Sequence, residues 1–135
     1  MSERPALEDN ELLHRQVHPN WLKAGGGLMS IAFCPTPKDD RKLSTMRDKL
    51  SSAEESYRRH TGDGSGLQSA GTWSVSHGEV EQAELDCDDD GGCSDLPWAH
   101  ASIVFSEDFS RKQMERKAAQ LRNRAEERGK QYPAG

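Results

Sequence analysis

The sequence predicts a small α+β protein: a mainly antiparallel sheet of about four strands with about three helices, the last of them long. Short segments of strand length alternate with segments that start with a helix-capping pattern. The chain has 135 residues, of which 33% are hydrophobic and 30% charged, which suits one modest core. We expect residues 1–11 to be a flexible N-terminal arm, residues 12–130 a single α+β domain, and residues 131–135 a C-terminal tail.

The start of the domain is expected to form two neighbouring strands. Residues 12–18 alternate between the two faces of an extended chain, which places His14 and His18 on the same face. Residues 28–33 follow three glycines and are apolar enough for a second strand. The next segment, residues 35–40, contains two prolines and is therefore expected to be a loop. If the two strands pair, this loop comes close to His14.

A capping pattern predicts the first helix. Ser51 with Glu54, and Ser52 with Glu55, both have the spacing at which a hydroxyl and a carboxylate satisfy free amides at a helix start. The predicted helix spans about residues 52–60 and ends at a glycine-rich segment.

A strand, a helix and another strand are expected next. Residues 72–75 alternate between polar and apolar side chains, as a half-buried strand does. Ser76 and Glu79 repeat the capping pattern and open a helix that we expect to extend to about Cys87. Residues 99–105 give the clearest strand pattern of the chain.

The C-terminal helix has the most complete pattern. Ser110 and Gln113 fit its start, and Gly129 suits the position just after its end. Its apolar stripe recurs at helical spacing and consists of Met114, Ala118, Leu121 and Ala125.

Charge is distributed unevenly along the chain. The net charge is −5, which argues against a surface built throughout for nucleic acid. Residues 79–95 hold eight acids and no Lys or Arg, whereas residues 110–130 hold eight bases and three acids. The acidic segment and the basic helix are each expected to be either a partner surface or simply solvated. The helix lacks aromatic residues for base stacking, so nucleic acid is the weaker choice of partner.

The compartment is inferred from hydropathy and cysteines. The longest apolar stretch, residues 27–33, is far shorter than the roughly 20 residues that cross a bilayer, so we expect no membrane span. The three cysteines leave at least one without a partner in the chain, which favours a reducing, cytoplasmic location.

Several segments together resemble a group of small uncharacterised bacterial proteins. The segments are His14-Arg15-Gln16-Val17-His18-Pro19, Ala32-Phe33-Cys34-Pro35-Thr36-Pro37-Lys38-Asp39-Asp40, Leu43-Ser44, Ser52-Ala53-Glu54 and Ala99-His100-Ala101. The resemblance covers most of residues 12–130 and implies a bacterial protein, but it implies no activity, since none is attached to the group. Residues 86–95 depart from the shared pattern.

One candidate binding cluster draws on separate parts of the sequence. Imidazole, guanidinium, ammonium and carboxylate groups supply the proton transfer and the charge that acid–base chemistry or anion binding requires. The alternative is a set of structural residues: hydrogen-bonded strand histidines and a turn aspartate. The cluster consists of His14, Arg15, His18, Lys38, Asp39 and His100.

Metal and cofactor motifs are incomplete in this sequence. Residues 86–91 have the opening of a calcium loop, but Pro97 occupies the position of the closing bidentate acid. Cys87, Cys93 and His100 do not have the ligand spacing of a zinc site. We therefore expect no metal site and no cofactor.

Two functions remain open at this point. The first is a small cytosolic binding or adaptor protein that acts on another bacterial protein, suggested by the separated charges and by the lack of a complete catalytic motif. The second is an enzyme that acts on a nucleotide or phosphate-bearing substrate through the candidate cluster. An ADP-ribosyltransferase serves only as an analogy for the second, because the full motif of that family is absent.

Overall fold

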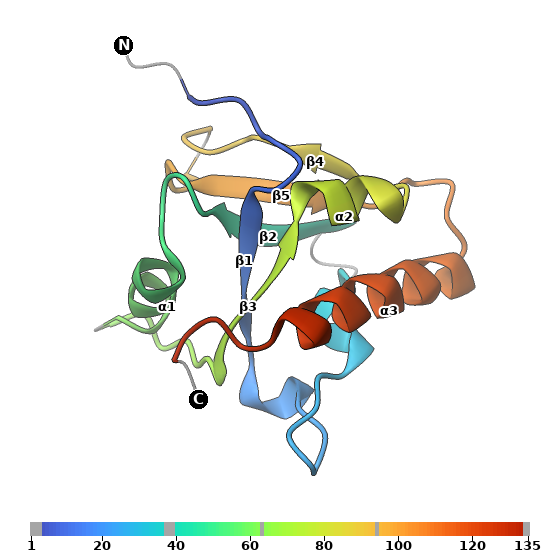
Figure 1. Ribbon diagram of the computed structural model, residues 1–135, viewed down its shortest axis with the longest axis horizontal. Helices are drawn as coiled ribbons and strands as arrows, with labels where there is room; N and C mark the ends of the chain where they lie inside the picture. Colours follow the sequence, from blue (N-terminus) through green and yellow to red (C-terminus); the bar gives the residue numbers. More distant parts are fainter. Residues whose placement is uncertain (1–3, 37–39, 63, 94, 134–135) are drawn as a thin grey trace.

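A five-stranded antiparallel sheet, in the order β3-β1-β2-β5-β4, forms the centre of the computed structural model, which describes residues 4–36, 40–62, 64–93 and 95–133 (Figure 1). The strands are β1 (Leu12–Val17), β2 (Lys42–Arg47), β3 (Gly71–Ser76), β4 (Asp86–Asp88) and β5 (His100–Val104). The helices are η1 (Pro19–Trp21) and η2 (Ser30–Phe33), both of the 3-10 type, and α1 (Ala53–Thr61), α2 (His77–Gln82) and α3 (Arg111–Arg128). The α+β class and the long C-terminal helix are confirmed, but the sheet has one strand more than predicted.

All three α-helices begin where the capping patterns predict. Ser52 caps α1, Ser76 caps α2 and Ser110 caps α3, and each forms a reciprocal capping box. Of the two registers open for α1, the structure uses Ser52 with Glu55. Because a capping box satisfies amides that have no partner inside the helix, these short patterns are reliable starts.

The prediction of a second strand at residues 28–33 is wrong. The segment ends in the 3-10 helix η2, and its backbone is tied to α3: the Leu28 amide donates to Glu126 Oε2 at 2.9 Å, and Arg122 donates to the Leu28 carbonyl at 3.4 Å. Several backbone groups of this segment therefore bond within the segment or to side chains of α3. The strands that pair with β1 are β2 and β3.

Two strands lie where none was predicted. β2 alternates correctly, but its buried face includes Thr45 and Arg47, so the segment does not look apolar. β4 follows α2, which ends at Gln82 instead of continuing to Cys87. Glu84 has a positive φ of 62° just after that helix, a conformation that interrupts helical geometry. Cys87 then pairs with Ile103 in the sheet.

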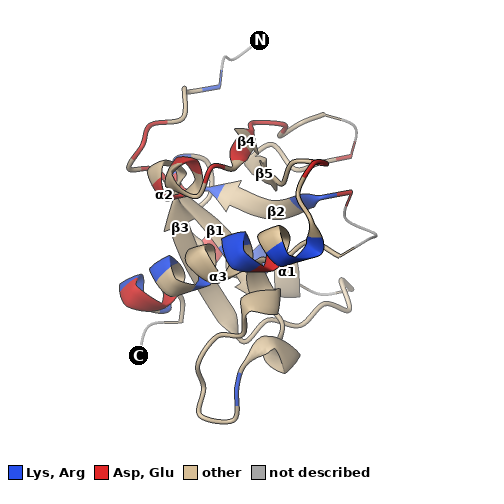
Figure 2. Cartoon of the chain, turned by 90° about the vertical axis from the view of Figure 1, so that its right-hand side faces the viewer, with Lys and Arg blue, Asp and Glu red and all other residues tan. Residues whose placement is uncertain are grey.

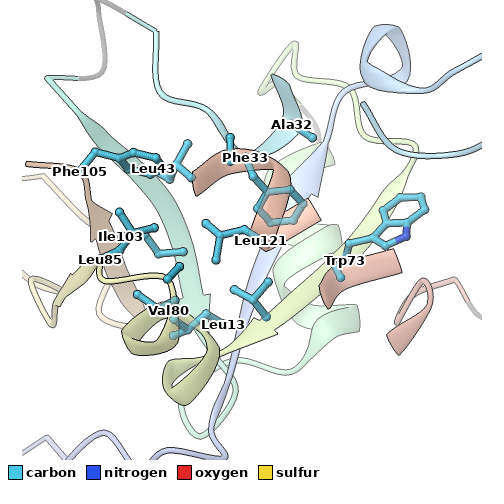
Figure 3. Close-up of a cluster of buried hydrophobic side chains, with 14 of the residues drawn as sticks. Leu13, Ala32, Phe33, Leu43, Trp73, Val80, Leu85, Ile103, Phe105 and Leu121 are labelled. Atoms are coloured by element: carbon cyan, nitrogen blue, oxygen red, sulfur yellow. The ribbon is translucent and has the colours of Figure 1, made fainter. Parts of the chain in front are cut away.

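The hydrophobic core lies between the sheet and α3 (Figure 3). Leu13 and Ile103 point from the strands toward Phe33 of η2 and Leu121 of α3, and all four are fully or almost fully buried. Burial of one such side chain contributes about 1.5–3 kcal/mol, so this layer supplies most of the stabilisation of the sheet.

The opposite face of the sheet is polar. Cross-strand register aligns Ser74, His14, Met46 and His100 in one row across four strands. α1 lies on this side, opposite α3 (Figure 1), and the Thr72 hydroxyl of β3 donates to the Ala53 carbonyl at its start. One face of the sheet is thus apolar and covered, and the other is polar and only partly covered.

Candidate functional site

A cavity of about 450 Å³ lies on the polar face of the sheet. This volume is in the range of small-molecule sites. Four of the six residues predicted for the candidate cluster line it. The described lining residues are His14, Arg15, Gln16, His18, Trp21, Ser44, Thr45, Met46, Ser56, Arg59, His60, Leu67, Gln68, Pro97 and His100.

The sheet register explains why His14 and His100 share this cavity. Met46 of β2 pairs with His14 on one side and with His100 on the other. Adjacent strands lie about 4.8 Å apart, so the two histidines are separated by roughly 10 Å on the same face. They line the two sides of one space and do not contact each other directly.

Arg15 enters the cavity where two strands separate. The β1–β2 pairing is confined to Leu13 and His14, after which the strands diverge. The Arg15 guanidinium lies in this gap and donates to the Ala32 carbonyl at 2.9 Å and to the Ser44 carbonyl at 3.1 Å. It also stacks near Trp21, 5.4 Å from the ring centre. These contacts fix a permanent positive charge at one side of the cavity.

His14 is buried, and both of its ring nitrogens have partners within the fold. The side chain is 2% exposed, with Nε2 at 2.8 Å from Asp48 Oδ1 and Nδ1 at 2.7 Å from Ser74 Oγ. Because the carboxylate only accepts, Nε2 carries the proton and Nδ1 accepts from the hydroxyl. Burial lowers the pKa of His14, against the opposing effect of Asp48. Ser74 is fully buried, so this Ser-His-Asp arrangement offers no accessible nucleophile.

His18 and His60 lie at the open side of the cavity. Nδ1 of His18 accepts from the Asn20 amide at 3.0 Å, which caps η1 and leaves the proton on Nε2. Burial, together with the positive charges of Arg15 and His18, lowers the pKa of His60. All three side chains line the same cavity.

Arg59 is an exposed residue of α1 that sequence reasoning missed. It precedes His60 and lines the same cavity. Its neighbour Arg58 points elsewhere, to Glu54 at 2.8 Å and to the Tyr132 hydroxyl at 3.1 Å. When two arginines are adjacent in a helix, the sequence alone does not indicate which of them faces a site.

His100 forms the most specific arrangement in the cavity. Asp90 accepts from His100 Nδ1 at 2.7 Å and from the Ser102 hydroxyl at 2.6 Å. These hydrogen bonds to Ser102 and His100 outweigh burial and lower the pKa of Asp90. His100 is 5% exposed, and within the described residues its Nε2 has no hydrogen-bond partner.

The Asp90 contact orients that unpaired nitrogen. With the proton on Nδ1, the Nε2 lone pair points away from Asp90, and His100 lines the cavity whereas Asp90 does not. An imidazole oriented by a carboxylate in this way can accept or donate a proton or bind a ligand. A buried polar atom without a partner is costly, which is why such atoms point to bound water or ligand.

The acidic segment is used inside the fold. Arg47 is 0% exposed and donates to both carboxylate oxygens of Glu11, at 3.0 and 2.8 Å, and to Asp89 Oδ2 at 2.9 Å. Arg4 pairs with Asp89 from the other side. Of the carboxylates at positions 1, 3 and 5 of the incomplete calcium loop, Asp90 already has partners within the chain, His100 and Ser102. Glu11, placed in the expected flexible arm, is 4% exposed.

Lys38 and Asp39 of the predicted cluster lie outside the described residues. The described neighbours, Thr36 and Asp40, line a different cavity beside Arg111 of α3. The loop was expected near His14 because the first two predicted strands were expected to pair. That pairing does not occur, because residues 28–33 do not form a strand.

The charge of the histidine cavity is one-sided. Its described lining includes two arginines and four of the five histidines of the chain, but no Asp or Glu, although the chain has 23 acids. Within the described residues, the cavity histidines do not bring three metal-ligating atoms together. The arrangement therefore favours an anion over a metal ion.

Two of the three cysteines, Cys34 and Cys87, are poor nucleophiles in this environment. Burial raises the pKa of Cys87 to about 12 and also raises that of Cys34. Neither lines the histidine cavity. Since the thiolate is the reactive form, these residues do not suit covalent catalysis.

Comparisons complete the description of the site. In the described parts of the chain, no helix combines the length and the apolar character needed to cross a membrane. Comparisons with family models, with curated proteins and with solved structures found no match.

Proposed function

We propose that the cavity binds a small phosphate-bearing molecule and that His100 transfers protons to or from it. The observation that carries the proposal is the lining: Arg15, Arg59 and four histidines without an acid, in a chain of net charge −5. The two arginines concentrate positive charge here, opposite in sign to the net charge of the whole molecule. This positive charge attracts an anion and excludes cations.

Phosphate is the favoured anion on chemical grounds. Arginine presents planar pairs of donors that match the oxygens of phosphate, and each charge-assisted hydrogen bond is about twice as strong as a neutral one. His18 adds an Nε2–H donor, because its Nδ1 accepts from the Asn20 amide. Arg15 approaches from the sheet and Arg59 from α1, so a phosphate between them would be bound from two sides.

The Asp90–His100 pair supplies the chemical step in this proposal. Nε2 of His100 can take a proton from an attacking water or hydroxyl and return it to a leaving oxygen. Asp90 holds the tautomer that leaves this nitrogen unprotonated, and the Ser102 hydroxyl holds Asp90. His14 does not suit this role, because both of its ring nitrogens already have partners, Ser74 and Asp48.

Two adjacent arginines provide a matched experiment. Arg59→Ala should weaken the binding of inorganic phosphate and of adenosine 5′-monophosphate in isothermal titration calorimetry by about ten-fold, since a lost charge-assisted bond costs about 1.5–3 kcal/mol. Arg58→Ala removes the same charge from the same helix but outside the cavity, and should leave binding within two-fold or so of wild type. Equal losses in both variants, or no binding by wild type, would refute the proposal.

Protein binding is a second proposal with weaker support. Figure 2 shows acidic residues around β4 and α2 and basic residues along α3. Much of the acidic charge has partners within the chain, however: Asp89 pairs with Arg47 and Arg4, and Glu79 with Arg128. The basic outer face of α3 is the stronger reason to keep an adaptor role under test, by pull-down with charge-reversed α3 variants.

A further inference from the structure

We infer that Asp9, His77 and Glu81 form a binding site for a divalent transition-metal ion such as Zn²⁺. One ligand atom from each residue lies within 4.8 Å of the other two. Sequence reasoning predicted no metal site and did not consider these residues, because Asp9 is 68 positions from His77. The site is separate from the histidine cavity, which His77 does not line.

Two of the ligands are placed by helical geometry. His77 and Glu81 are four residues apart on α2 and therefore lie on the same side of the helix. His77 Nδ1 is 3.8 Å from Glu81 Oε1. Within the described residues, this Nδ1 is a buried atom without a hydrogen-bond partner. An unpaired imidazole nitrogen beside a carboxylate is the arrangement that a metal ion would complete.

The third ligand is held by backbone hydrogen bonds. The Gly78 amide donates to the Asp9 carbonyl at 2.8 Å, and the His77 amide donates to the Glu11 carbonyl at 3.0 Å. A Cβ atom on Gly78 would lie only 3.1 Å from that Asp9 carbonyl. The glycine therefore lets Asp9 approach the first turn of α2 closely, and the position of Asp9 is defined by the fold.

The distances suit a small adjustment on metal binding. Ligand atoms around a tetrahedral zinc ion are about 3.4 Å apart, given bonds of about 2.0–2.2 Å. Asp9 and Glu81 are exposed, so their carboxylates can move by the required ångström or so without disturbing the core. The nearby Glu79 is not available, since Arg128 and the Ser76 amide occupy its oxygens.

The donor set selects the kind of ion. One imidazole and two carboxylates suit Zn²⁺, Co²⁺ or Mn²⁺, whereas Ca²⁺ and Mg²⁺ prefer oxygen ligands alone. Three protein ligands leave at least one position open. Asp9 and Glu81 also line a surface hollow of about 630 Å³ that includes Arg124 and has room for water or an anion.

Cobalt provides a direct probe. The untagged, metal-free chain titrated with Co²⁺ should develop visible absorption from one bound ion, and Zn²⁺ should displace it. His77→Ala and Glu81→Gln should each weaken binding by at least about ten-fold, because even the loss of groups that only orient ligands costs 10–100-fold. Glu84→Gln, an exposed acid just after α2 that pairs with Lys117, is the control and should bind as wild type does.

A second readout covers variants that disturb folding. Zn²⁺ should raise the melting temperature of wild type, since a ligand of the native state stabilises it, and should not do so for Asp9→Asn. Glu81 is exposed, so its substitution is not expected to unfold the chain. Binding that survives in Glu81→Gln and His77→Ala, or that is lost in His60→Asn of the cavity, would overturn the assignment.

Discussion

The two faces of the sheet differ in how their side chains are satisfied. Toward α3, Leu13, Leu43 and Ile103 pack against Phe33 and other apolar side chains (Figure 3). On the opposite face the polar side chains form hydrogen bonds, as His14 does with Ser74 of β3 and Ser102 does with Asp90, and His14 and His100 line the cavity. The apolar side chains of the first face stabilise the fold by burial and need no hydrogen-bond partners. The polar side chains of the second face contribute little net stability and leave polar atoms beside a cavity. The period of two along each strand therefore separates most core residues from the cavity residues. Arg15 shares the face of Leu13 and reaches the cavity through the gap between β1 and β2.

Arg47 is the exception to this division. It shares the face of Leu43 and Thr45 on β2, yet it is a fully buried charge. The hydrogen bonds and charges of Glu11 and Asp89 outweigh burial and raise the pKa of Arg47. This ion network joins the segment before β1, the strand β2 and the loop after β4.

The largest predicted effect is therefore at Arg47. Arg47→Ala should lower the free energy of unfolding by about 3–5 kcal/mol, because it leaves the buried carboxylate of Glu11 without its partner. Urea unfolding followed by circular dichroism measures the change. Lys49→Ala, which breaks the exposed pair with Glu8, is the control and should change the free energy of unfolding little, because solvent screens exposed ion pairs. A similar loss of unfolding free energy in the two variants would show that the buried ion network stabilises the fold no more than an exposed ion pair does.

Two leucines test the two faces directly. Leu121→Ala on the α3 face should cost about 2–5 kcal/mol, since it removes a fully buried side chain and leaves a cavity. Leu67→Ala changes an exposed leucine that lines the histidine cavity, and should cost about 0.5 kcal/mol or less. Phosphate binding should survive Leu121→Ala as long as the protein is folded, because Leu121 does not line the cavity. Equal costs in thermal unfolding would contradict the division between the faces.

A smaller effect is expected from pH. Burial lowers the pKa of His14 and of His60, so the unfolded chain takes up protons at these residues at higher pH than the folded chain does. Stability is then complete above the ordinary histidine pKa of about 6.5 and decreases as the pH falls below it. The slope of unfolding free energy between about pH 7 and pH 5 should be shallower in His14→Gln and in His60→Gln. An unchanged slope in both variants would argue against buried neutral histidines on the polar face.

Much of the fold could be predicted from local patterns. Capping boxes place α1, α2 and α3, and alternation places β1, β3 and β5. β4 was missed because the capping pattern predicted a helix to Cys87, which Glu84 interrupts. β2 was missed because its inward-facing Arg47 is stabilised by partners far away in the sequence. Arg47 needs Glu11 and Asp89, which lie 36 and 42 positions away. No local window contains those partners, and without them a buried arginine argues against a strand.

The candidate site could be predicted only in part. His14, Arg15, His18 and His100 were chosen by chemistry. The register through Met46 brings His14 and His100 to one cavity, which Arg15 and His18 also line. The roles of these residues differ in ways that only contacts reveal. His14 is held between Asp48 and Ser74, whereas His100 keeps one nitrogen unpaired.

The most direct test of the central claim uses the five histidines as probes. Inorganic phosphate is titrated into the metal-free, ¹⁵N-labelled chain, and the imidazole nitrogens are followed by long-range ¹H–¹⁵N NMR. We predict saturable shifts at His100 Nε2 and at His18 and His60, with His77, which does not line the cavity, unchanged. The titration should extend to about 10 mM, well above a Kd of about 1 mM, which corresponds to only about −4 kcal/mol. Shifts at His77 as large as those at His100, or no shift at any histidine, would contradict a phosphate site on the polar face.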